Sequence, residues 1–142
     1  MFERYTEKAR RIIFFARYEA LQYGSLVISP EHILLGLLRE DKTMSAKFFP
    51  FRLSSDMIRR EVESRIVLRE KMPQSAELHL APETKRILAF SREESERLRS
   101  RSIGTEHLLL GLLREERSIA AEILFEQGVR LQGVREEISR QV

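Results

Sequence analysis

The residues with the most chemical potential in this chain are two glutamate–histidine pairs, Glu31-His32 and Glu106-His107. Each pair stands where a helix is expected to begin. A metal ion needs three or four converging ligands, and adjacent residues on a helix do not face each other, so these pairs do not predict a metal centre. We expect each histidine to pack or hydrogen-bond against a neighbouring loop, and the third histidine, His79, to be exposed. The two glutamates either complement a helix dipole or accept a cationic group from a partner, and spacing alone does not separate these roles.

The sequence also lacks the residues and motifs that nucleophilic catalysis and nucleotide hydrolysis require. The chain has no cysteine, which excludes disulfides, thiolate metal sites and thiol nucleophiles. It contains no Gly-x-Ser-x-Gly turn and no glycine-rich phosphate loop ending in Lys-Ser or Lys-Thr. We therefore predict that this chain has no catalytic residues, no cofactor and no enzymatic activity of its own.

Charge and hydropathy indicate whether a nucleic acid or a membrane is a partner of this chain. The net charge of the 142 residues is +3, and acidic and basic side chains are mixed along the chain, which is typical of solvated helices. A nucleic-acid partner is a weaker alternative that would use the arginine excess, namely Arg59, Arg60, Arg97, Arg99 and Arg101. No apolar run approaches the roughly 20 residues of a membrane helix, and no apolar signal core follows the N-terminus. We expect a cytoplasmic protein with neither a membrane nor a nucleic acid as partner.

An internal repeat organises the chain. The segment Glu31–Glu40 recurs as Glu106–Glu115, 75 residues later, with one of ten positions changed. Segment 53–62 also matches 129–138 after a one-residue slip. A repeat of this kind decides the fold. We predict two tandem copies, about 1–67 and 79–142, joined by a linker at about 68–78.

Each copy is predicted to form four helices. In the first copy, Thr6 is a suitable N-cap for a helix that ends at Gly24, and Ser29-Pro30 begins a second helix that is apolar all round and therefore central. The remaining helices are expected at about 44–49, 54–66, 82–99, 105–115, 118–127 and 131–141. The fold class is thus all-α, with eight helices as two four-helix repeats in pseudo-twofold symmetry within one domain, 1–142. Gly36 and Gly111, at matching positions, predict close helix–helix approach.

These segments resemble a known family. Residues 2–10 (FERYTEKAR) resemble the opening of the N-terminal domain of ClpC-type AAA+ unfoldases, and 31–40 and 104–115 resemble the paired motif of Clp repeat (Clp N) domains. The likeness covers essentially the whole chain. It implies an eight-helix, pseudo-twofold domain that binds adaptor proteins and protein substrates. It also implies a ClpP-type protease as a partner only through a full-length unfoldase, and a monomeric isolated domain. A stand-alone Clp-repeat regulator or adaptor, not fused to an ATPase, remains the alternative.

The resemblance also implies where partners bind. In the family the motif glutamates, here Glu31 and Glu106, hold phosphorylated arginine in two sites related by the repeat. A carboxylate can take the guanidinium as a two-pronged pair, and a helix N-terminus can take the phosphate. Thr6 caps one such terminus, and the matching position in the second copy is an alanine followed by Pro82. The remaining candidates implied by the resemblance are Arg10 and Lys85 for phosphate charge and Phe2 for the surface that binds cyclic peptides.

One apolar cluster has no counterpart in the second copy. Phe48-Phe49-Pro50-Phe51 places three aromatic rings within four residues. We interpret it as part of the core, with a docking patch as the alternative.

Overall fold

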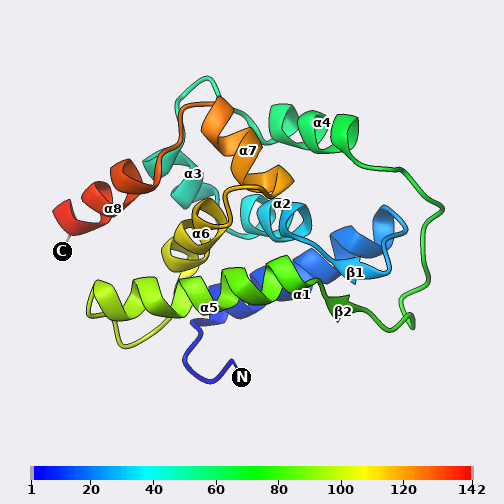
Figure 1. Cartoon of the computed structure of the whole chain (residues 1–142), viewed down its shortest axis with the longest axis horizontal. Coiled ribbons are helices and arrows are strands. Elements are labelled where there is room, and N and C mark those ends of the chain that lie inside the picture. The colour runs from blue at the N-terminus through cyan, green and yellow to red at the C-terminus, as the bar shows by residue number, and fades with distance from the viewer. Residues whose placement is uncertain (1, 142) are drawn as a thin grey trace.

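The computed structural model describes residues 2–141, which form eight helices and one two-stranded parallel sheet (Figure 1). We call 2–66 repeat one and 79–141 repeat two. Repeat one contains α1 (Glu7–Gln22), α2 (Pro30–Glu40), α3 (Lys42–Phe48) and α4 (Ser55–Arg65). Repeat two contains α5 (Pro82–Arg97), α6 (Thr105–Arg114), α7 (Ile119–Glu126) and α8 (Leu131–Arg140). The all-α class and the eight predicted helices are confirmed.

The third helix begins earlier than the sequence suggests. The prediction placed its start at Met44, whereas α3 starts at Lys42. Asp41 is the cause, because its side-chain Oδ1 accepts a hydrogen bond from the backbone N–H of Met44 at 3.0 Å. This carboxylate satisfies one of the open N–H groups of the first turn, so helix α3 starts directly after it.

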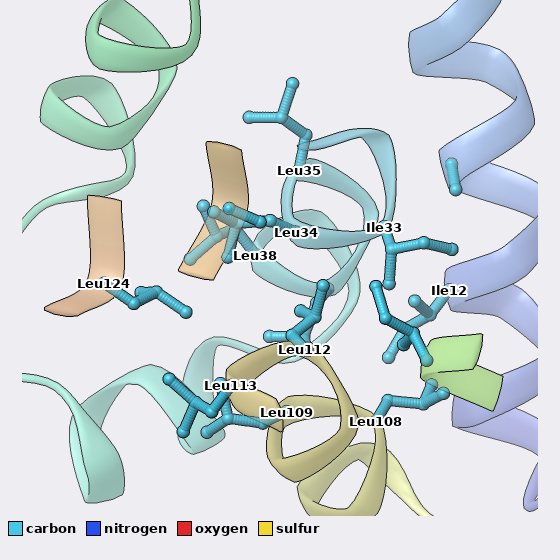
Figure 2. Packing of buried hydrophobic residues seen from close by; sticks show 14 of the residues in the cluster. Ile12, Ile33, Leu34, Leu35, Leu38, Leu108, Leu109, Leu112, Leu113 and Leu124 are labelled. Atoms are coloured by element: carbon cyan, nitrogen blue, oxygen red, sulfur yellow. The ribbon is translucent and has the colours of Figure 1, made fainter. Parts of the chain in front are cut away.

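The core lies between the two central helices. Five buried residues of α2 and five of α6 are leucine or isoleucine, and Figure 2 shows leucines of both helices directed into one shared cluster. Leu34 and Leu37 of α2 and Leu109 and Leu112 of α6 have no exposed surface. Each such leucine contributes about 1.5–3 kcal/mol through burial. Because both repeats supply this cluster, they form one body.

Glycine allows the first two helices of each repeat to touch. A Cβ atom at Gly36 of α2 would lie 2.6 Å from the carbonyl oxygen of Ile12 and 2.9 Å from the backbone nitrogen of Ala16, both in α1. At the matching position in α6, a Cβ on Gly111 would collide with Ser91 and with the carbonyl oxygen of Ile87, 2.5 Å away. The predicted close approach is confirmed at both positions.

A buried carboxylate ties the last helix of each repeat to the first. In repeat one, Glu19 of α1 accepts hydrogen bonds from the guanidinium of Arg59 in α4 at 2.8 and 3.0 Å. In repeat two, Glu94 of α5 accepts them from Arg135 of α8 at 2.9 and 2.6 Å, and from Arg114 of α6 at 3.1 Å. The two clusters occupy matching places. Arg59, one of the arginines considered for nucleic acid, is therefore part of the scaffold.

Short parallel pairings connect the two repeats, and the sequence did not predict them. Strand β1 (Val27–Ile28), just before α2, pairs with β2 (His79–Leu80), just before α5 (Figure 1). A single bridge joins Tyr5, before α1, to Ile103, before α6. The two pairings are equivalent under the 75-residue offset. As a result, the start of each repeat's first helix lies beside the start of the other repeat's central helix.

The linker and the phenylalanine cluster are the main irregular surfaces. Residues 67–78 contain no helix or strand, and the linker is held to α1 by Arg17, which donates to the carbonyl oxygens of Gln74 and Ala76 at 2.6 and 2.9 Å. In the cluster, Phe49 is buried but Phe51 is fully exposed, so the core interpretation holds for Phe49 and is wrong for Phe51. Within residues 2–141, no helix has both the length and the apolar character needed to cross a membrane.

Candidate functional site

Both motif glutamates lie in the first turn of a central helix, each beside a buried histidine. The Nδ1 atom of His32 accepts a hydrogen bond from the backbone N–H of Ser29 at 2.9 Å, and that of His107 accepts one from Gly104 at 2.8 Å. Burial lowers the pKa of His32 to about 4, so the ring is neutral near pH 7. The histidines therefore fasten the helix start. No group of three or more metal-ligating side chains was found within residues 2–141.

Glu31 faces the start of α5 from the other repeat. The backbone N–H of Ala81, the N-cap of α5, donates to the carbonyl oxygen of Ile28 at 3.0 Å, and the buried Thr84 hydroxyl donates to the same oxygen at 2.8 Å. These bonds bring Glu83, the second residue of α5, into the same cleft as Glu31. Burial raises the pKa of Glu31, and the negative charge of Glu83 raises it further.

Glu106 has the equivalent position beside α1. The backbone N–H of Thr6 donates to the carbonyl oxygen of Ile103 at 3.0 Å, three residues before Glu106. The Thr6 hydroxyl caps α1 by accepting from the N–H of Ala9 at 3.1 Å. Thr6 belongs to the same copy as Glu31, but it lies beside the start of the other copy's central helix, which carries Glu106. Each candidate site is thus built from both repeats.

The cleft at Glu31, which we call the Glu31 cleft, has a charged side and a volume of about 580 Å³. Arg86 and Arg114 line it, but both are already paired, since Arg86 bonds Glu115 of the same cleft at 2.6 Å and Arg114 bonds Glu93 and Glu94. The charges left for a ligand belong to Glu31, Glu83, Glu116 and Arg117.

The opposite side of the same glutamate is mainly aliphatic, with Arg69 also lining it. Glu31 and Ile119 also line a neighbouring hollow together with Leu26, Ile66 and Val67. The side chains of Leu26 and Val67 are 64% and 74% exposed, although both are aliphatic. Exposed aliphatic side chains beside a half-buried carboxylate indicate a surface for a partner that carries both an apolar group and a cation.

The remaining predicted site residues lie apart from Glu31. Lys85 lines a separate cleft with Arg4, Tyr5 and Leu88, so the structure does not bring it to the Glu31 cleft. Phe2 is half-buried and packs edge-to-face on the Tyr5 ring, with centroids 5.0 Å apart, next to that cleft. Arg10 is exposed on α1, and Pro82 is the exposed first residue of α5.

Sequence reasoning missed Glu83, Leu26 and Val67 as site residues. The signal for Glu83 was present, because aligning the repeats at the 75-residue offset sets Glu83 against Lys8. Leu26 and Val67 gave no such signal, since they belong to a loop and to the linker.

Together, the fold and these two surfaces define a class: an all-α double repeat that presents two equivalent candidate sites, each built from both repeats. The chain matches the Clp repeat (R) N-terminal domain family over residues 4–127, with a second match over residues 82–142. It belongs to that family, as the resemblance implied.

Similar proteins support this family assignment. The chain is 40% identical over 139 residues to the negative regulator of genetic competence ClpC/MecB of Bacillus subtilis, and 39% identical over 143 residues to the chloroplastic chaperone protein ClpC of Pisum sativum. These matches cover 97% and 100% of this chain but only 17% and 15% of the relatives. The N-terminal domain of the chaperone ClpD from Arabidopsis thaliana has the same fold, with a TM-score of 0.78 and 27% identity over 99% of this chain and 96% of that domain.

Proposed function

We propose that this chain is the protein-recognition module of a Clp/Hsp100 ATP-dependent unfoldase. It binds adaptor proteins and protein substrates, and hands substrates to the ATPase rings of a full-length unfoldase and, through them, to a ClpP-type protease. The relatives that the chain matches over almost its entire length are Clp chaperones, and this supports the proposed role.

One structural feature links the proposal to particular residues. The same arrangement occurs twice, in which a motif glutamate at the start of a central helix lies beside the start of the other repeat's first helix. A carboxylate accepts both N–H groups on one edge of a guanidinium, which is a short, charge-assisted pair. Glu31 and Glu106 are therefore the proposed anchors for arginine side chains presented by partners.

Phosphoarginine is the finer ligand that we propose, and its phosphate needs donors as well. The open N–H groups at the start of α1 and the positive end of the helix dipole suit a phosphate beside Glu106. Thr6 shapes this helix start through its cap, and Lys8 adds positive charge within the first turn. Arg10 and Lys85 are exposed cations on α1 and α5 and extend this surface, while Tyr5, against which Phe2 packs, lines the neighbouring cleft.

Isothermal titration calorimetry with free phosphoarginine tests the proposal. The parent chain should bind, and the double variant Glu31→Gln, Glu106→Gln should lose binding because the guanidinium then has no charged acceptor. Glu96→Gln, an exposed glutamate in the last turn of α5, is the control and should bind as the parent does. Binding that survives unchanged in the double variant would contradict the assignment of the two anchors.

A further inference from the structure

The two candidate sites carry opposite charges at one matching position. Glu83 is the second residue of α5 and Lys8 is the second residue of α1, 75 residues earlier. Glu83 lies in the cleft with Glu31 and raises the pKa of that carboxyl group through its negative charge. The equivalent place beside Glu106 belongs to a lysine. The backbone is therefore pseudo-twofold symmetric, but the charges at this matching position are opposite.

The surrounding side chains reinforce this difference. In the Glu31 cleft, Arg86 and Arg114 are held by their own glutamates, which leaves three carboxylates against the single guanidinium of Arg117. Within residues 2–141, no lysine or arginine nitrogen lies within 4.0 Å of the Glu31 carboxylate. The cleft thus carries an excess of negative charge. Its half-buried Glu31 carboxylate has no cationic partner among the described residues and can accept one from a ligand.

The positions around Glu106 that match the Glu31 cleft carry more positive charge. Asp41 matches Glu116 at the repeat offset, but both of its oxygens are occupied, by the Thr105 hydroxyl at 2.9 Å and by the N–H of Met44 at 3.0 Å. Lys42 matches Arg117 and is exposed. With Lys8 in place of Glu83, the positions that match the Glu31 cleft carry two lysines, Lys8 and Lys42, together with the Glu106 carboxylate and the exposed Glu7, which matches Pro82. That combination suits a ligand with both charges.

The two sites also differ in the apolar surface beside the motif glutamate. Leu26 and Val67 lie beside Glu31 and expose most of their aliphatic surface. The residue that matches Leu26 in repeat two is Arg101, which is exposed and charged. A ligand of the Glu31 cleft therefore gains from an apolar side chain next to its cation, and this gain is absent beside Glu106.

We propose that the Glu31 cleft binds a protein segment in which an unphosphorylated arginine or lysine stands next to an aliphatic side chain, and that phosphoarginine is left to the Glu106 site. The cation lies between Glu31 and Glu83, and the aliphatic side chain lies in the hollow of Leu26, Ile66 and Val67. A phosphate on the arginine would add about −1.5 to −2 charges at pH 7 next to Glu83 and would be repelled. This proposal rests on the proposed function for the position of the two sites.

Three peptides that differ at one residue provide the test. Each carries a leucine next to arginine, phosphoarginine or uncharged citrulline, with a fluorophore for anisotropy. The Glu106→Gln variant isolates the Glu31 cleft. There, we expect the arginine peptide to bind about tenfold more tightly than the phosphoarginine and citrulline peptides.

Charge-swapped variants complete the design. In the Glu106→Gln background, Glu83→Lys should abolish or reverse the preference, because it gives the cleft the charge found beside Glu106. Lys8→Glu is the matched substitution at the other site and should weaken phosphoarginine binding in a Glu31→Gln background. Leu26→Arg should weaken the arginine peptide at the Glu31 cleft. Circular dichroism of each variant confirms folding, and the exposed or half-exposed positions of residues 8, 26 and 83 favour it.

The outcomes separate this inference from the proposed function. Equal or tighter binding of the phosphoarginine peptide in the Glu106→Gln variant overturns the inference and leaves the proposed function intact. Arginine-peptide binding at the Glu31 cleft, with no phosphoarginine binding at either site, supports the inference for that cleft and removes the phosphoarginine part of the proposed function. If none of the three peptides binds the parent chain, both fail.

Discussion

The two buried carboxylate clusters and the two candidate sites at Glu31 and Glu106 show how a duplicated fold changes unevenly. Glu19 and Glu94 hold their arginines in matching places, and both clusters tie the last helix of a repeat to its first. At the surface, by contrast, Lys8 of one repeat is replaced by Glu83 in the other. A buried charge must keep its partner, whereas an exposed charge can be reversed at little cost to stability. The buried clusters of the two repeats are therefore alike, whereas the charges at their candidate sites differ.

The largest expected effect concerns the buried clusters. Glu94→Ala should lower the free energy of unfolding by about 3–4 kcal/mol, because it leaves Arg135 without its acceptor and leaves Arg114 only with the exposed Glu93. Glu19→Ala should cost less, since the side chains of Arg59 and Arg39 are 38% and 46% exposed, against 19% and 23% for the arginines at Glu94. Urea unfolding of the two variants measures the difference. A larger loss for Glu19→Ala would contradict it.

Acid should weaken both repeats through their buried histidines. The pKa of His32 in the folded chain is about 4, below the value of about 6.5 in an unfolded chain. A lowered folded pKa means that the stabilisation is complete above pH 6.5 and is lost as pH falls towards 4. For His32 this amounts to up to about 3 kcal/mol. His107 is shifted in the same direction by burial.

Unfolding measured from pH 7 to pH 4 checks the histidine prediction. His32→Asn should flatten the loss of stability between pH 6.5 and pH 4, since the group that titrates is gone. His79→Asn is the control at an exposed position and should leave the profile of the parent unchanged. Identical profiles for the parent and His32→Asn would show that His32 does not become harder to protonate on folding.

Next in size is the contact between the first two helices. Gly36→Ala places a Cβ against backbone atoms of Ile12 and Ala16, which cannot move aside without shifting α1. We expect a loss of about 2 kcal/mol, as for overpacking of a dense core. Gly133→Ala in α8 is the control, because a Cβ there meets nothing within 4 Å and alanine favours helix, so stability should stay constant or rise. Thermal unfolding distinguishes the two results.

The smallest effect tests the helix starts beside the two glutamates. Thr6→Ala should cost about 1 kcal/mol, because the N–H of Ala9 loses its acceptor. Ala81→Thr supplies the missing hydroxyl at the matching position in repeat two, where no side chain caps α5. The residue is 3% exposed, so the gain is limited by the space for the larger side chain. Chemical denaturation of both variants gives the comparison, and an unaffected Thr6→Ala would refute the capping role.

Much of the fold was predictable from the sequence because it depends on local patterns. The Glu31–Glu40 and Glu106–Glu115 repeat set the copy number, and caps such as Thr6 and Ser29 marked helix starts. The short sheet was not predictable, since two-residue strands have no periodicity and pair only when the helices have packed.

The same limit applied to the sites. The motif named Glu31 and Glu106, but it did not show that each lies beside the first helix of the other repeat. The reversal from Lys8 to Glu83 is visible in the sequence, yet its meaning depends on the contact between the loops before α2 and α5. Fold was encoded in local periodicity, whereas site composition depended on pairings between distant residues.

A two-dimensional NMR titration of the nitrogen-15-labelled chain tests the central claim most directly. Added separately, the arginine–leucine peptide should shift the amide signals of Leu26, Glu31 and Glu83, and the phosphoarginine peptide those of Thr6, Lys8 and Glu106. Two distinct sets of shifted signals are the predicted result. A single set shared by both peptides would contradict the account, because the two repeats would then recognise the same ligand.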